Sequence, residues 1–347
     1  MMRSKTYVAT PPGETIKEQL IDRGISQKEF ALRMDMSEKH ISKLINGEVQ
    51  LTTDVAIRLE MVLGLPANFW SKLEHIYREK LIKVQKENDL MADFEIAKKM
   101  PYREMVLNHW IPDEKNPADK VFNLRKFFEV VRLDLLKESP INNVNFRKLG
   151  ENRSSDYTLL AWAQKAKIEA RKETVAPINI KKLENNLQNI RNMTQMNPEE
   201  FSKKLQKILA DCGIAIVYLP HIGGSFLHGA TFYDGPKIVL GMTVRGKYAD
   251  RFWFSLFHEF GHIVLGHLGK QSETDEISAD EFARDTLIPY KNWDQFVREN
   301  KFNKNNIINF ANAIGIDPGI IVGRLQKEQY IDFNSLNSLK TQYEISA

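Results

Sequence analysis

Cysteine is nearly absent from this sequence: Cys212 is the single one among 347 residues. One thiol excludes an internal disulfide and a cysteine-rich zinc site, and it fits a reducing compartment. Cys212 stands directly before an apolar run, so we expect it to be a small side chain that fills space near a core rather than a nucleophile.

Long hydrophobic runs are also missing. No stretch of about 18 apolar residues is available to span a bilayer, and the first fourteen residues lack the apolar segment of a secretory signal. We therefore expect a cytoplasmic protein without a membrane partner. The formal net charge of +4 is too small to indicate nucleic acid by itself.

The chain is long enough for two or three domains, with 42% hydrophobic and 27% charged residues. Residues 1–85 look like a module of short helices. Residues 86–194 form a polar, mostly helical stretch with several prolines and a loop-like sequence at 139–143, which we interpret as a linker and helical lead-in. Residues 195–347 form the last predicted domain.

After Gly213 the sequence pattern changes from helical to strand-like. Residues 214–219 are an apolar run of strand length, and residues 230–233 and 237–240 flank an Asp-Gly turn, which predicts a small β-meander or hairpin. An apolar helix is expected over 249–267 and a second one from about 276 to 287. The predicted fold is mainly α with a small β-sheet, an α+β class.

The N-terminal module contains two short helices joined by a tight turn. Ser26 is an N-cap with Glu29 three residues later, which forms a capping box. Ser37 caps the next helix, and Asn46-Gly47 ends it. This joint predicts a helix-turn-helix, whose second helix enters the major groove of double-stranded DNA. The polar side chains available to DNA are Ser26, Gln27, Ser37, Glu38, Lys39, His40, Ser42, Lys43 and Arg58.

The charge of this module leaves an alternative open. Residues 14–80 contain ten Lys/Arg and eleven Asp/Glu, so the module is not basic. Glu38 repels phosphate unless it accepts a hydrogen bond from a cytosine amino group. A helical interaction module that never touches DNA is the competing interpretation.

The module resembles the XRE-type helix-turn-helix family, especially its HigA-like antitoxin branch. The similar segments are Gly24-Ile25-Ser26-Gln27-Lys28, residues 41–47, residues 56–59 and Asn68-Phe69-Trp70. The resemblance implies that the protein binds an operator as a homodimer and regulates its own gene.

Residues 258–262 read His-Glu-Phe-Gly-His. On a helix, His258 and His262 lie one turn apart on the same face and can ligate one zinc ion. Glu259 is then placed as a general base toward a water molecule. The apolar helix around the motif favours this interpretation, because buried polar groups need partners.

Zinc needs a third protein ligand. A metzincin pattern is excluded, because Leu265 and Leu268 stand where it requires glycine and histidine; His267 is one residue out of place and is expected on the same helix. Glu276, on a second helix, is the preferred ligand. Asp280, one turn later, is placed to fix the tautomer of a ligand imidazole. Glu273, expected in a loop, and Glu281, expected to point away, are the rivals of Glu276.

Residues 252–267, Glu276, Ala279-Asp280 and residues 287–289 resemble the ImmA/IrrE family of zinc metallopeptidases. The resemblance implies a gluzincin-like domain with Zn²⁺ on His258, His262 and Glu276 and with Glu259 as the base. It also implies cleavage of XRE-type repressors, with an edge strand, here 229–233, that pairs with the substrate. Tyr233, His228 and His267 are candidates for stabilising the oxyanion.

Three functions remain in competition. The first is a transcription regulator with an active zinc endopeptidase domain that cleaves itself, a partner repressor or a toxin. The second is a HigA-like antitoxin whose metal domain is a non-catalytic sensor or toxin-binding platform. The third is a peptidase whose N-terminal module binds only protein.

An internal echo links the two ends of the chain. Its second copy carries apolar residues after the cap where the first carries polar ones, so we expect the second copy to be a packing unit and not a DNA reader. Phe30, Met36, Ser37 and Ile41 recur at the spacing of Phe310, Ile316, Asp317 and Ile321.

Overall fold

The protein was studied as a computed structural model, which describes residues 2–138, 153–222, 228–243, 248–269 and 272–343. The chain divides into two compact units, Met1–Glu95 and Ile96–Ala347. The fold is mainly α with small sheets, as the sequence predicts. The loop-like sequence at 139–143 lies outside the described residues. None of the helices in the described part is long and apolar enough to cross a bilayer.

The N-terminal unit is built from helices around one core. Ile16, Phe30, Ile41 and Leu59 are fully buried, and Trp70 closes the core from the fifth helix. A small hairpin, β1 (Met2–Arg3) with β2 (Val8–Ala9), precedes the helices. The helices are α1 (Gly13–Asp22), α2 (Gln27–Arg33), α3 (Glu38–Ile45), α4 (Thr53–Leu63) and α5 (Ala67–Ala97), which continues past the boundary.

The second unit is organised around a three-stranded sheet in the order β3-β5-β4. β4 (Gly229–Asp234) and β5 (Lys237–Thr243) form the predicted antiparallel hairpin. β3 (Ile214–Leu219) pairs with β5 in parallel, so the alternative of a meander is wrong. A parallel neighbour needs a crossover, which short-range sequence patterns do not reveal.

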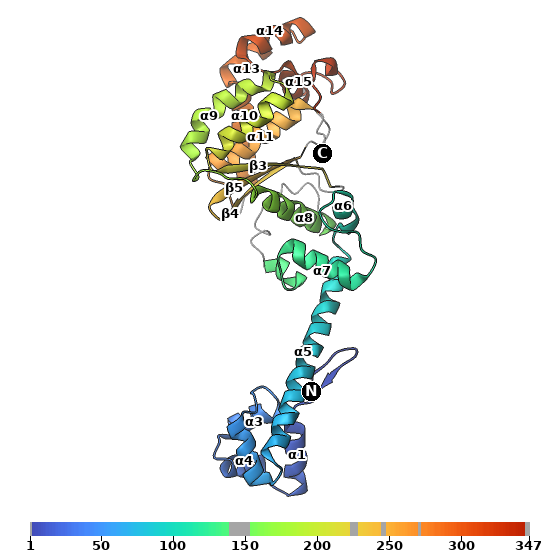
Figure 1. The fold of residues 1–347 in the computed structure, drawn as a ribbon. Helices are drawn as coiled ribbons and strands as arrows, with labels where there is room; N and C mark the ends of the chain where they lie inside the picture. Colours follow the sequence, from blue (N-terminus) through green and yellow to red (C-terminus); the bar gives the residue numbers. More distant parts are fainter. Residues whose placement is uncertain (1, 139–152, 223–227, 244–247, 270–271, 344–347) are drawn as a thin grey trace. The chain divides into compact units, whose positions relative to one another are not determined.

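Helices cover both faces of the sheet (Figure 1). α8 (Arg153–Ala170) lies on one face, where a Cβ on Gly241 would stand 2.3 Å from Cη2 of Trp162. The opposite face carries α10 (Pro198–Ala210) and α11 (Ala249–Val264). Because the core under α8 also includes residues 96–136, the stretch interpreted as linker and lead-in shares a core with the sheet. The predicted division at residue 194 stays a prediction.

Buried hydrogen bonds join several of the helices of this unit. Arg191, which is buried, donates hydrogen bonds to the carbonyls of Leu287, the last residue of α12 (Glu273–Leu287), and Ile314, the last residue of α14 (Lys304–Ile314). The helices are α6 (Tyr102–Leu107), α7 (Pro117–Phe128), α9 (Ile180–Asn192), α10 (Pro198–Ala210), α11 (Ala249–Val264), α12 (Glu273–Leu287), α13 (Tyr290–Arg298), α14 (Lys304–Ile314) and α15 (Pro318–Lys327), with 3₁₀ turns at Leu133–Glu138, Met193–Gln195 and Asn337–Leu339.

The predicted echo is present as two helix pairs with the same turn. Met36 N–H donates to the Ala31 carbonyl at 3.0 Å, and Ile316 N–H donates to the Ala311 carbonyl at 3.1 Å. In α15, Ile321 is fully buried, together with its neighbours on either side. The expectation that the second pair is a packing unit is therefore confirmed.

Candidate functional site

Helix α11 carries the three polar side chains of the His-Glu-Phe-Gly-His motif into the core of the second unit. His258, Glu259 and His262 are 6%, 7% and 3% exposed. The surrounding residues of α11 are apolar and buried, which makes the helix a core element. Buried polar groups of this kind require partners within the protein or a bound ion.

Helix α12 brings those partners from the next segment of the chain. Ser272 and Asp275 form a reciprocal capping box that starts the helix. α12 packs closely on α11, because a Cβ on Gly261 would stand only 3.0 Å from the Cα of Ala279. This approach places Glu276, one turn before Ala279, beside the two histidines.

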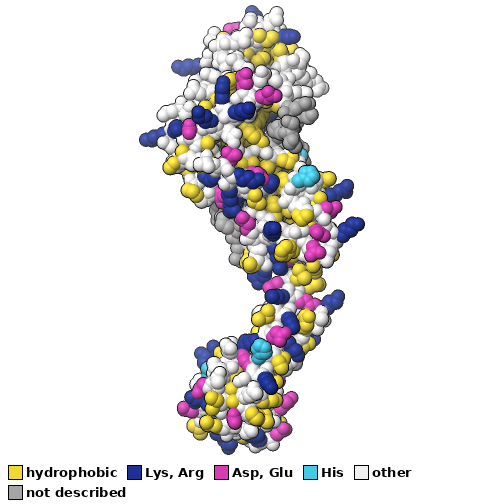
Figure 2. All heavy atoms as spheres, viewed as in Figure 1, with side chains coloured by type: hydrophobic (Ala, Val, Ile, Leu, Met, Phe, Trp, Pro, Cys, Tyr) yellow, Lys and Arg dark blue, Asp and Glu magenta, His cyan; other side chains and the backbone are white. Residues whose placement is uncertain are grey.

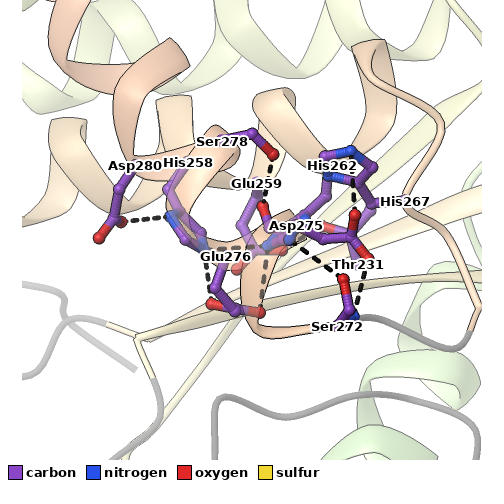
Figure 3. Close-up of polar contacts among 10 residues, drawn as sticks. All are labelled: Thr231, His258, Glu259, His262, His267, Ser272, Asp275, Glu276, Ser278 and Asp280. Atoms are coloured by element: carbon purple, nitrogen blue, oxygen red, sulfur yellow. Dashed lines mark hydrogen bonds and ion pairs between the residues drawn. The ribbon is translucent and has the colours of Figure 1, made fainter.

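The side chains of His258, His262 and Glu276 converge on one point (Figure 3). Nε2 of His258 lies 3.0 Å from Nε2 of His262. The Glu276 carboxylate reaches these two nitrogens at 3.4 and 3.5 Å. One donor atom from each residue lies within 4.8 Å of the others, so the three side chains could hold a metal ion.

Asp280 fixes the orientation of one imidazole. Nδ1 of His258 donates to Oδ1 of Asp280 at 2.7 Å, which leaves Nε2 directed toward His262 and Glu276. Burial disfavours a charge on His258, but the hydrogen bonds to Asp280 and Glu276 outweigh it and raise the pKa of His258. Burial and the neighbouring His258 lower the pKa of His262.

The residues present fit a divalent cation. Two buried imidazole nitrogens that face each other repel when both are protonated, and a cation between them with a carboxylate removes that conflict. His262 Nδ1 is buried and has no hydrogen-bond partner among the described residues. Two nitrogens and one carboxylate form a donor set that suits a transition metal rather than calcium or magnesium.

The sheet supplies a partner for Glu259. The Thr231 hydroxyl, on β4, donates a hydrogen bond to Oε2 of Glu259. The absence of a side chain at Gly229 leaves room for Glu259, because a Cβ there would stand 2.9 Å from Cγ of Glu259. The contact with Thr231 was not predicted. Its sequence signal was the period of two along the strand, which puts residues 229 and 231 on one face.

Two expectations about the other acidic and histidine residues are wrong. α11 ends at Val264, because Gly266 adopts a left-handed conformation (φ +77°), so His267 follows the helix instead of lying on it. Glu273 is the first residue of α12 and not part of a loop, since Ser272 caps the helix there. Glu281 is exposed and lies 3.9 Å from Arg284, as expected for a side chain that points away from the two histidines.

The three residues considered for the oxyanion lie in different settings. His267 is 3.5 Å from Asp275, and its ring centroid is 5.6 Å from that of His262. Tyr233 is 54% exposed on the edge strand β4. His228, half-buried, precedes the same strand.

The polar residues predicted to face DNA lie on α2, α3 and their caps, except Arg58, which lies on α4. Ser26 accepts a hydrogen bond from Glu29 N–H, and Ser37 accepts one from His40 N–H. The reciprocal half of the first capping box is replaced, since the Glu29 carboxylate accepts from Arg33 at 2.5 Å. Gln27, Glu38, Lys39 and Lys43 are exposed, and His40 and Ser42 are half-buried.

Arg58 has partners inside the N-terminal unit. Its guanidinium donates to the Met34 carbonyl at 3.0 Å and to Asp54 at 2.8 Å. The bond to Met34 ties α4 to the turn between α2 and α3, whereas the bond to Asp54 lies within α4. Figure 2 shows Lys/Arg and Asp/Glu side chains interspersed over this unit, without a patch of one sign on the face in view.

Two family models match the chain in the units just described. The helix-turn-helix model covers residues 16–70, and the IrrE N-terminal-like domain model covers residues 242–316. The fold and the two motifs thus define a regulator-type helix-turn-helix protein with an added metallopeptidase-type domain. The chain belongs to the helix-turn-helix family, of XRE type, and carries an IrrE-like domain.

The similar proteins match about a fifth of the chain. An uncharacterized HTH-type transcriptional regulator, YddM of Escherichia coli (strain K12), is 33% identical over 66 residues, which are 19% of this chain and 70% of YddM. Antitoxin HigA-1 of Vibrio cholerae serotype O1 is 39% identical over 64 residues, 18% of this chain and 60% of that protein. A solved addiction module antidote protein of the HigA family from Coxiella burnetii is 27% identical, with a TM-score of 0.21 over 23% of this chain and 94% of that one.

Proposed function

We propose that this protein is a cytoplasmic, DNA-binding transcription regulator with a zinc-dependent endopeptidase domain that cleaves a regulator protein or the chain itself. One observation carries the enzymatic part: donor atoms of His258, His262 and Glu276 lie within 4.8 Å of one another in a buried site. Glu259, a potential base, adjoins them on the same helix.

Zinc is the metal that we assign to His258, His262 and Glu276. Three protein ligands of nitrogen and oxygen leave one tetrahedral position open, as in catalytic zinc sites. When bound, zinc polarises a peptide carbonyl and lowers the pKa of a water molecule. Asp280 keeps the Nδ1 proton on His258, so that Nε2 is the ligand atom.

The protein's own residues supply the remaining functions. Glu259 accepts the proton of the attacking water and passes it to the leaving amine. β4 is an edge strand of its sheet and can pair with an extended substrate backbone. Tyr233, His228 and His267 remain candidates for stabilising the oxyanion.

In the N-terminal unit we propose that α3 enters the major groove of an operator, with the protein bound as a homodimer. The exposed Lys39 and Lys43 contact phosphate or bases there, and Glu38 accepts from a cytosine amino group. At the start of α2, Ser26 and Gln27 contact the phosphates. The predicted set of DNA contacts also includes Ser37, His40, Ser42 and Arg58. The helix-turn-helix relatives support this proposal.

The enzymatic proposal is tested by measuring metal content and self-cleavage of the purified full chain. We expect about one zinc per chain and slow self-cleavage, which Glu259→Gln abolishes without loss of zinc. Glu281→Gln, on the exposed side of α12, is the matched control and keeps both properties. A wild-type protein that binds no zinc contradicts the proposal.

The DNA-binding proposal is tested with a fragment of the protein's own promoter. We expect a shift whose affinity falls steeply as salt rises, because phosphate contacts release counterions. If no fragment from that promoter is bound, the remaining possibility of a peptidase with a protein-binding module is favoured.

The second candidate function is an antitoxin-type repressor whose metal domain is a non-catalytic sensor or toxin-binding platform. The 39% identity with antitoxin HigA-1 favours it. This alternative is supported if the protein binds its promoter and a toxin encoded beside it, and if neither the wild type nor Glu259→Gln cleaves itself.

A further inference from the structure

The edge strand β4 has two different faces. Ala230 and Phe232 point to the core shared with α8. Gly229 and Thr231, which alternate with them, contact Glu259 of α11 on the other face. Thr231 is 7% exposed, and its hydroxyl contacts Glu259 inside the protein.

These two residues surround the Glu259 side chain in complementary ways. The Thr231 hydroxyl donates to Oε2, one of the two carboxylate oxygens. At Gly229, an added Cβ would stand 2.9 Å from Cγ and 3.0 Å from Oε1 of Glu259. The strand therefore provides a hydrogen-bond donor for one carboxylate oxygen (Figure 3). At Gly229 it also leaves the room that the rest of the Glu259 side chain fills.

We propose that Thr231 and Gly229 are positioning residues that seat the Glu259 carboxylate beside His258 and His262, an inference that rests on the function proposed above. A general base acts efficiently only when its oxygen is already placed at the proton that it removes. A glutamate side chain has three rotatable bonds, and its rotamers must be restricted by neighbours. The buried Thr231 hydroxyl restricts them from the strand, and the missing side chain at Gly229 leaves room for the rotamer that Glu259 adopts.

The structural test compares crystal structures of the zinc-loaded full chain in four forms. Thr231→Val keeps the shape of the side chain but removes the donor, whereas Thr231→Ser keeps the donor. Gly229→Ala fills the space. We expect Glu259 to keep its rotamer in the wild type and in Thr231→Ser, and to move in the other two. An unmoved carboxylate in both Thr231→Val and Gly229→Ala overturns the proposal.

The functional test measures self-cleavage rates of the same proteins. We expect Thr231→Val and Gly229→Ala to be slower by roughly 10- to 100-fold, with rescue by Thr231→Ser and unchanged zinc content. Equal rates in an active wild type and Thr231→Val overturn the positioning role. If the wild type cleaves nothing but Glu259 moves in Thr231→Val, the proposed enzymatic function is contradicted. The positioning of the Glu259 carboxylate by Thr231 is then still supported.

Discussion

Helices α3 and α11 both carry the polar residues of a proposed site, but they carry them in opposite environments. In α3, Lys39 and Lys43 extend into solvent while Ile41 and Leu44 pack inward. In α11, the polar side chains themselves are buried, and their partners come from α12 and β4. A solvated polar residue requires nothing from the rest of the fold, whereas a buried one requires a donor or acceptor placed by another element.

The comparison implies that the two sites respond differently to substitution. A change on the exposed side of α3 alters binding with little effect on stability, because surface substitutions are nearly neutral. A change in α11 leaves a buried partner unsatisfied. The predictions below test this difference, beginning with the largest expected effect.

His258→Ala removes a metal ligand and breaks the contact with Asp280. We expect bound zinc, measured by atomic emission, to fall from about one per chain to near zero. Promoter binding stays at the wild-type level, because the substitution lies in the other unit. Joint loss of zinc and promoter binding would show that the two units do not act independently.

Asp280→Ala removes the partner of the His258 Nδ1 proton but no ligand. We expect zinc affinity, measured by competition with a chelator, to fall roughly 10- to 100-fold. Asp280→Asn keeps an acceptor oxygen and loses less. Equal affinities in all three proteins would mean that burial alone orients His258.

Lys43→Ala tests the solvated side of the comparison. We expect promoter affinity to fall roughly five- to tenfold at 0.1 M salt, and the slope of log affinity against log salt to decrease by about 1. Lys72→Ala, an exposed substitution on α5, is the matched control. Unchanged binding by Lys43→Ala excludes α3 as the reading helix.

Ser37→Ala removes the side-chain cap of α3. We expect a loss of about 1 kcal/mol in the free energy of unfolding of the N-terminal unit, seen as roughly fivefold faster hydrogen exchange of its protected amides. Ser71→Ala, exposed on α5, is the control. Exchange that is equally slow in both variants would mean that the Ser37 cap does not stabilise the N-terminal unit.

The sequence predicted those parts of the molecule that local rules determine. The caps Ser26 and Ser37, the end of α3 and the β4–β5 hairpin all follow from neighbours within a few residues. Glu276 and Asp280 were expected near the two histidines from the length of the connection and the helical period, and the structure brings them there.

The remaining features depend on contacts between distant segments. The parallel pairing of β3 with β5, and the packing of residues 96–136 beneath α8, leave no mark on short windows of sequence. The hydrogen bond from Thr231 to Glu259 joins two residues that are 28 positions apart in the sequence. The misplaced ends of α11 and α12 show the usual limit of boundary prediction, since the decisive residues, Gly266 and Ser272, each allow other roles.

Phe260 and Gly261, which lie between Glu259 and His262, differ from solvent-facing spacers in what they tolerate. Phe260 is fully buried, and Gly261 faces the α12 backbone so closely that a methyl group strains the packing. A library randomised at these codons and selected for metal retention should therefore return glycine at 261 and large apolar residues at 260. The residue types at 260 and 261 therefore reflect how closely α12 packs against α11.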